Sequence, residues 1–243
     1  PKPRVLWLKF DTGMHRLGFA LEHAKEAIAR ARALDIPLRF MTHFANTHHR
    51  GDASVHAQMD RFEQLLACEA GERSLANSGA VLGYQRAHGD WVRPGRMLYG
   101  VSPFDHEVGA DLGLLPVMTL RSRLISVRQV RAGEAVGYGG AYVCPQDMPV
   151  GVLAYGYGDG YPRHAQPGTP ILVRGIRTEV LGHCSMDMMT VDLRPVPDGR
   201  FGDVVTLWGD GLPIEEVARA SGTIPYELLC RVRMRAQYEE GEP

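Results

Sequence analysis

Lysine is scarce in this sequence of 243 residues: three of its 27 basic residues are lysines (Lys2, Lys9 and Lys25), and the other 24 are arginines. Neither charge is in excess, because 28 acidic residues bring the formal net charge to -1. A protein dedicated to nucleic acid or to an anionic membrane surface carries a basic excess. The sequence also has no apolar run near the roughly 20 residues that span a bilayer. We therefore expect no nucleic-acid and no membrane partner.

Cysteine is sparse as well, and its spacing excludes two kinds of protein. The four cysteines, Cys68, Cys144, Cys184 and Cys230, are far apart and form no Cys-x-x-Cys pair. They predict neither a zinc site nor a disulfide-stabilised secreted scaffold. We interpret them as reduced thiols of a cytoplasmic protein, and we predict no metal.

The sequence opens directly on a strand-like segment. No initiator methionine and no signal peptide come before Val5, and residues 5–10 have the pattern of a buried strand. From this start we expect that an N-terminal piece is missing.

The first half alternates predicted strands with predicted helices. One helix is expected over residues 20–34, and a second begins after Ser54 as its N-cap and ends at Gly71. The expected strands cover residues 5–10, 37–44, 73–78 and 91–100. Such alternation indicates parallel strands joined by crossover helices.

The second half consists of short β-branched segments separated by glycine and proline, which indicates a mostly antiparallel β domain. A short helix, Ile214 to Ala220, interrupts it. The expected strands cover residues 118–130, 150–157, 170–173, 179–181, 188–193 and 204–207.

The predicted fold class is α/β plus β, with a partial (β/α)8 barrel of the TIM type over residues 1–115 and the β domain over 116–243. About four βα units are half of an eight-stranded barrel. Half a barrel leaves open strand edges and an uncovered core. An open, doubly wound sheet is therefore the alternative.

Three clusters combine glycine with aromatic and charged residues. Lys9, Asp11 and Arg16 lie together after the first predicted strand, Tyr138 lies among three glycines, and residues 155–163 hold three tyrosines. A tyrosine that acts as a base needs a nearby cation or histidine to lower its pKa from about 10. Taken singly, the three clusters are better explained as a salt-bridged turn, a glycine-rich hairpin and a surface turn.

Further polar residues follow the other predicted strands. His43 ends the second strand, Asn77 and Ser78 follow the third, and the segment from Arg93 to Gly95 follows the fourth. The carboxyl ends of parallel strands form the face on which such folds build their sites. No Gly-x-Gly-x-x-Gly precedes a helix, so a dinucleotide site is not predicted.

With these motifs the sequence resembles the alanine racemase family, enzymes of fold type III that depend on pyridoxal phosphate. The matching segments are KFDTGMHRLGF at 9–19, THF at 42–44, NSG at 77–79, DWVRPGRMLYGVSP at 90–103, GEAVGYGGAY at 133–142, YGDGYPR at 157–163, SMDMMTVDL at 185–193 and LWGDGLPIEEVA at 207–218. Their order and spacing agree with the family. The match covers the back two thirds of the usual chain.

The resemblance implies a cytoplasmic enzyme that interconverts L- and D-alanine by moving the Cα proton between two bases. Its role would be either to supply D-alanine for peptidoglycan or to degrade alanine. It assigns the catalytic roles to Tyr138, His43 and Arg93, with Arg93 donating to the pyridine nitrogen. It assigns substrate binding to Arg16, Lys9, Met186, Tyr157 and Asp187. It assigns the cofactor phosphate to Ser78, Gly95, Arg96 and Tyr226, with Asn77 nearby. It matches Lys9 to a lysine that the family often carbamylates, and it implies a homodimer that shares its sites through Tyr157, Met186 and Asp187.

Two departures from the family pattern stand out. Gly182-His183-Cys184 replaces the usual Gly-Arg-Val. In the family, a lysine on the first barrel strand forms the Schiff base with the cofactor and acts as the second base. None of the three lysines here has matching sequence around it, so we expect this chain alone to be inactive. The alternatives are a racemase of broader specificity for serine or basic amino acids, an inactive truncated homologue, and a noncatalytic pyridoxal-phosphate-binding barrel protein, which the β domain disfavours.

Overall fold

The computed structural model describes residues 3–233 and 235–240, so Lys2 lies outside the described residues. The chain forms two compact units, Pro1–Glu107 and Val108–Pro243. Within the described ranges, no helix has both the length and the apolar character to cross a membrane.

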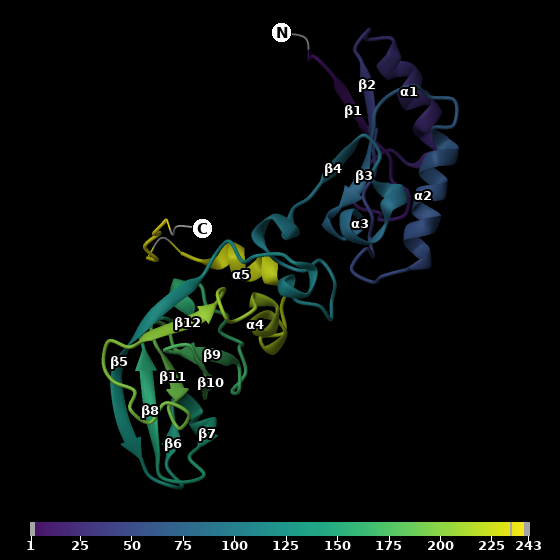
Figure 1. Ribbon diagram of the computed structural model, residues 1–243. Helices are drawn as coiled ribbons and strands as arrows, with labels where there is room; N and C mark the ends of the chain where they lie inside the picture. The colour runs from purple at the N-terminus through teal and green to yellow at the C-terminus, as the bar shows by residue number, and fades with distance from the viewer. Residues whose placement is uncertain (1–2, 234, 241–243) are drawn as a thin grey trace. The chain divides into compact units, whose positions relative to one another are not determined.

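A four-stranded parallel sheet forms the centre of the first unit (Figure 1). Its strands are β1 (Leu6–Lys9), β2 (Leu38–Met41), β3 (Arg73–Asn77) and β4 (Trp91–Arg93), in the order β1-β2-β3-β4. A doubly wound sheet reverses its strand order at a switch point. The strictly sequential order is that of a singly wound sheet, so the doubly wound alternative is wrong for this unit.

Helices cover the sheet from one side. They are α1 (Ala24–Arg32), preceded by the 3-10 turn η1 (Leu21–His23), then α2 (Ala53–Leu65) and the short α3 (Ser78–Gly83), and Figure 1 shows α1 and α2 together along one face of the sheet. The 3-10 turn η2 (Gln85–Ala87) follows α3. Leu8, Phe10 and Phe40 pack against Ile28 and Phe62 in one buried cluster.

The boundaries predicted for α2 are wrong at both ends. Asp52 is the N-cap, and its carboxylate accepts the N–H of Ser54 at 2.7 Å. The helix ends at Leu65, well before Gly71. A Cβ on Gly71 would lie 2.7 Å from the carbonyl oxygen of Leu38. Glycine at this position therefore lets the two backbone segments pass close to each other.

The strand predicted over 91–100 is much shorter, because β4 ends at Arg93. Pro94 has no N–H to continue the ladder. The chain turns instead into the 3-10 helix η3 (Arg96–Tyr99). This early turn brings Gly95 within hydrogen-bonding distance of Ser78.

The second unit is a closed antiparallel barrel (Figure 1), which confirms the predicted fold class of a parallel α/β part followed by an antiparallel β domain. Its strands close in the order β10-β11-β8-β5-β12-β9, and every neighbouring pair is antiparallel. They are β5 (Leu120–Val130), β8 (Met148–Leu153), β9 (Pro170–Val173), β10 (Ile176–Leu181), β11 (Met189–Asp192) and β12 (Val204–Trp208).

Short elements complete the second unit. The hairpin β6 (Ala135–Val136) and β7 (Tyr142–Val143) is joined by the 3-10 turn η5 (Tyr138–Gly140). The helix α4 (Ile214–Ala220) agrees with the prediction, whereas α5 (Pro225–Arg231) was not predicted. The remaining 3-10 turns are η4 (Gly109–Leu112) and η6 (Tyr157–Asp159).

Candidate functional site

Positive charge gathers at the carboxyl ends of β1 and β4 in the first unit, around His43 after the end of β2. The pKa of His43 is lowered from 6.5 to about 4, first by burial and then by the nearby charges of Arg93, Arg16 and Lys9, in that order. These four predicted residues are therefore neighbours. At neutral pH the His43 imidazole carries no charge among three cations.

Arg93 is held by the strand ends around it. Its Nη2 donates to the carbonyl oxygens of Thr42 at 2.7 Å and of Leu75 at 3.2 Å, and Nη1 donates to the hydroxyl of Ser74. Nη2 also lies 3.4 Å from Nδ1 of His43, which fixes Nδ1 as the acceptor nitrogen. Burial lowers the pKa of Arg93, yet a guanidinium remains charged at physiological pH.

A buried glutamine that sequence reasoning missed supports His43. The amide nitrogen of Gln58 donates to the His43 carbonyl at 3.0 Å and to the Thr12 hydroxyl at 3.2 Å, while its oxygen accepts the N–H of Ala45 at 3.0 Å. Thr12 in turn lies 2.8 Å from the hydroxyl of Thr42. The available signal was a glutamine next to Met59 on the apolar face of a predicted helix.

The loop that carries Arg16 is organised by Asp11. Burial alone would raise the pKa of this carboxyl, but the backbone N–H groups of His15, Gly13 and Met14 donate to it and lower the pKa below its ordinary value. The loop closes where Phe10 bridges Phe19. Arg16 itself is exposed on this loop.

Ser78 joins the end of β3 to the turn after β4. Its Oγ accepts the N–H groups of Gly95 at 2.8 Å and of Met97 at 3.4 Å. Because the oxygen accepts both bonds, its own proton can still be donated, and no acceptor for it is seen among the described residues. Asn77 is the N-cap of α3 and accepts from Ala80 at 3.1 Å. The hydroxyl and backbone donors of this turn, with the cation of Arg96 in it, suit a phosphate group.

Tyr138 lies in the second unit, at the tip of the β6–β7 hairpin. It is 77% exposed, and the glycines on either side, Gly137 and Gly139, have φ angles of 75° and 70°. Those left-handed conformations favour glycine and turn the chain tightly around the tyrosine. The phenol therefore projects from the unit instead of packing in its core.

Tyr157, Met186 and Asp187 come together on two loops of the same unit. The N–H groups of Tyr157 and Gly158 donate to the carbonyls of Ser185 at 3.0 Å and Met186 at 2.8 Å. The Asp187 carboxylate accepts from Arg235 at 2.7 Å. Met186 is 54% exposed, so its side chain is available to another surface.

The predicted site residues thus fall into two groups. The first unit holds Lys9, Arg16, His43, Asn77, Ser78, Arg93, Gly95 and Arg96, all at or just beyond strand ends. The second unit holds Tyr138, Tyr157, Met186 and Asp187 on loops, and Tyr226 in the first turn of α5.

Two family models match this chain. The model described as "Alanine racemase, N-terminal domain" matches residues 1–103, and the model described as "Alanine racemase, C-terminal domain" matches residues 117–239. Together they cover most of both units.

Curated relatives are similar over nearly the whole chain. The alanine racemase of Nitrosococcus oceani is 52% identical over 236 residues, which cover 96% of this chain and 66% of the relative. That of Aeromonas hydrophila is 49% identical over 242 residues, covering 98% and 68%. The chain therefore spans about two thirds of the length of these relatives.

Solved structures have the same fold. The biosynthetic alanine racemase from Pseudomonas aeruginosa aligns with a TM-score of 0.93 at 46% identity, covering 96% of this chain and 66% of that one. The alanine racemase from Bartonella henselae with covalently bound pyridoxal phosphate aligns with a TM-score of 0.85 at 28% identity, covering 95% and 65%.

Proposed function

Since this chain belongs to the alanine racemase family, we propose that it is the larger part of an enzyme that interconverts L- and D-alanine with pyridoxal phosphate. The observation that carries the proposal is the arrangement at the strand ends of the first unit. There a charged Arg93, a neutral His43 and the Ser78–Gly95 turn lie on neighbouring strands.

The donors of this arrangement fit pyridoxal phosphate. The Ser78 hydroxyl proton and the backbone and cation of Arg96 would hold the phosphate beside Gly95. Among the described residues the Nε–H of Arg93 has no acceptor, so it would donate to the pyridine nitrogen. When bound, the cofactor withdraws electrons from the substrate Cα and makes its proton removable.

Arg93 would restrain that chemistry. A guanidinium does not release its proton at physiological pH, so the pyridine nitrogen it contacts would stay unprotonated. Weaker electron withdrawal favours return of the proton to Cα over side reactions such as transamination. His43 supports this role, because its neutral Nδ1 lies beside the guanidinium and adds no positive charge.

Substrate binding and one proton transfer follow from the remaining residues. Arg16 would pair with the carboxylate of alanine. Lys9, after addition of carbon dioxide to its amine, would be an anion that orients Arg16 instead of repelling it. Tyr138 would remove or return the Cα proton on one face, and its exposed hairpin leaves the phenol accessible. We assign no residue of this chain to the proton transfer on the other face.

The exposed loops of the second unit would complete the site of another subunit. Tyr157, Met186 and Asp187 share two loops that are hydrogen-bonded to each other and project to the surface. We infer a homodimer in which these side chains and Tyr138 face the strand ends of the partner's first unit.

The test measures D-alanine formation from L-alanine, with pyridoxal phosphate added, on protein whose intact mass is determined in the same sample. At the mass of these 243 residues alone, we expect cofactor binding without racemisation. Protein that carries a further segment with the missing lysine should racemise alanine, and Tyr138→Phe should abolish that activity. The His23→Ala variant, altered at an exposed side chain of the first unit, should remain active.

Two outcomes would contradict the proposal. One is cofactor binding that is the same in wild type, Ser78→Ala and Arg93→Leu, which would remove the strand-end site. The other is that protein containing the lysine binds the cofactor but does not racemise alanine. The chain would then belong to a noncatalytic, cofactor-binding member of this family. Equal turnover of serine or basic amino acids would favour the broader specificity.

A further inference from the structure

We propose that His48, His49 and Asp105 form a binding site for a divalent transition-metal ion of the zinc type. One ligand atom from each of the three side chains lies within 4.8 Å of the other two. Nδ1 of His49 is 3.6 Å from Oδ2 of Asp105, and the two imidazole rings have centroids 4.1 Å apart. None of the three residues is among those assigned to alanine or pyridoxal phosphate, and the site does not depend on the proposed function.

The turn that carries the two histidines is fixed through its backbone. The N–H of His49 donates to the Asn46 carbonyl at 3.2 Å, and the hydroxyl of the buried Tyr84 donates to the His49 carbonyl at 2.7 Å. The same hydroxyl accepts the N–H of Asp52 at 2.9 Å. These bonds are made by the backbone of His49 and Asp52, so they do not occupy the imidazole nitrogens that would bind the ion.

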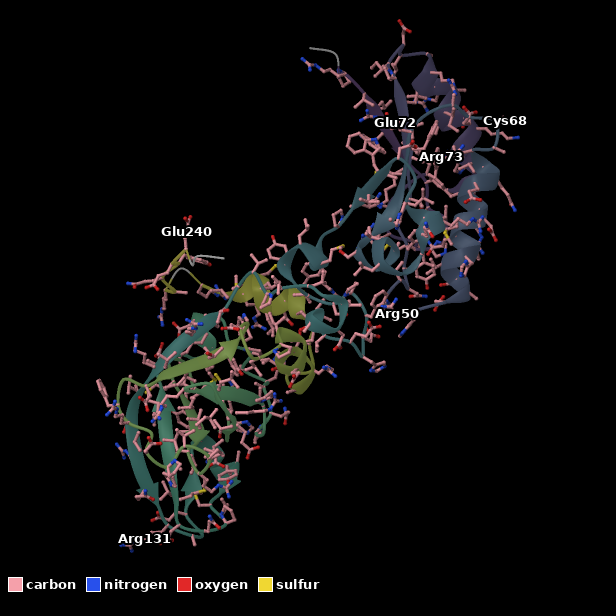
Figure 2. All side chains as sticks on the ribbon, in the orientation of Figure 1. Arg50, Cys68, Glu72, Arg73, Arg131 and Glu240 are labelled. Atoms are coloured by element: carbon pink, nitrogen blue, oxygen red, sulfur yellow. The ribbon has the colours of Figure 1, made fainter. Side chains whose placement is uncertain are left out.

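A single arginine ties the segment that carries Asp105 to this turn. Arg50, labelled in Figure 2, directly follows the histidines and donates from two nitrogens to the Glu107 carboxylate at 2.7 and 2.9 Å. Its guanidinium also lies 3.6 Å from the centre of the Phe104 ring. In the sequence Asp105 lies between Phe104 and Glu107, the two residues that Arg50 contacts. The segment with Asp105 is therefore held near the histidine turn before any ion binds. Glu107 also compensates the charge of Arg50, which would otherwise repel a cation.

The ligand set favours zinc-like ions over calcium and magnesium. Two imidazole nitrogens and one carboxylate oxygen are common zinc ligands, and three protein ligands leave a fourth position for water. Calcium and magnesium prefer oxygen ligands only. His49 and Asp105 are 54% and 43% exposed, so an ion can enter from solvent.

Metal binding would restrain the turn with His48 and His49, which lies next to the end of β3. Thr47, which precedes His48, donates to the Asn77 side chain at 2.9 Å, and a Cβ on Gly79 would lie 2.6 Å from the Thr47 carbonyl. A bound ion would therefore link residues 104–107 to a turn that already packs against the end of β3. The expectation of no zinc site rested on cysteine spacing, whereas these ligands are histidines and an aspartate from two distant segments of the chain.

The experiment is a titration of the full chain with zinc chloride, followed by calorimetry, and with cobalt chloride, followed by absorbance. Cys68, labelled in Figure 2, and Cys230 are exposed thiols that also bind zinc, so both are first replaced by serine. We expect one equivalent of metal to bind. His49→Ala and Asp105→Asn should each weaken binding by about tenfold or more. The exposed His23→Ala should bind as the parent does.

Circular dichroism in the presence of a chelator checks that each variant is folded. Asp105→Asn keeps the size of the side chain, so it remains informative if His49→Ala fails to fold. The proposal is overturned if the parent binds no zinc, or if His49→Ala, Asp105→Asn and His23→Ala bind zinc with the same affinity.

Discussion

At the scale of single residues, His43 depends on groups that surround it from other elements. Gln58 of α2 binds its carbonyl, and Arg93 at the end of β4 lies beside its Nδ1. Neither neighbour is close in sequence. Burial, and after it the charge of Arg93, keeps the ring neutral at a strand end where three cations meet.

Replacing Gln58 by leucine should destabilise the chain by about 1–3 kcal/mol, because the part-buried Ala45 N–H and the buried Thr12 hydroxyl lose a partner. Urea unfolding measures the change. Gln64→Leu, at an exposed position of the same helix, should change stability by less than about 0.5 kcal/mol. Equal effects of the two substitutions would show that the Gln58 hydrogen bonds contribute nothing.

His43 should also make stability depend on pH. Its pKa is 6.5 in the unfolded chain and about 4 in the fold, so acid protonates the unfolded state first. Stability should therefore fall as the pH drops from about 6.5 to about 4. Because a single proton titrates, the slope cannot exceed about 1.4 kcal/mol per pH unit, and solvent screening at this half-buried group reduces the total change. Denaturation across this range should show a shallower dependence for His43→Gln than for wild type or for the control His23→Gln.

At the scale of elements, the end of the chain holds the two loops that carry Tyr157 and Asp187. The N–H of Arg233 donates to the Asp159 carbonyl at 3.0 Å, and Arg235 bridges the carboxylates of Asp159 and Asp187. The Gly160 backbone closely approaches Arg231 at the end of α5. This packing gives the exposed loops a defined position although they lie outside the barrel.

Gly160→Ala should disrupt that packing. Its Cβ would lie 2.0 Å from the carbonyl oxygen of Arg231, and φ is 113°. Gly202→Ala is the matched control, since φ is 89° there and nothing lies within 4 Å. Both variants lose about 1–2 kcal/mol to the left-handed backbone, and Gly160→Ala should lose about 1–3 kcal/mol more from the clash. Equal melting temperatures for the two variants would contradict the close packing.

At the scale of the whole molecule, the residues assigned to one reaction lie in two units of the chain. If a homodimer shares its sites, Arg93→Leu and Tyr138→Phe damage different halves of each site. A hybrid dimer of the two variants then has one intact site. Refolding equal amounts of the two inactive, lysine-containing variants together should recover about one quarter of wild-type racemisation. No recovery, despite hybrid dimers detected by mass, would place both residues of a site in one subunit.

The sequence by itself determined the order of elements, the fold class and the position of most candidate residues. Local patterns suffice where a helix or strand is set by neighbours along the chain, as for Ile214–Ala220 and Pro170–Val173. Parallel strands put their carboxyl ends on one edge, so the strand pattern alone was enough to group His43, Ser78 and Arg93.

Only the tertiary structure decided which residues touch. Closure of the six-stranded barrel depends on pairing between distant strands, such as β10 with β11 and β12 with β9, whose register no local pattern encodes. The contacts of Gln58 and the meeting of His49 with Asp105 likewise join separate segments. Such contacts form when packing brings the segments together. The hydrophobic effect depends on the apolar area removed from water and not on how far apart two residues are in the sequence.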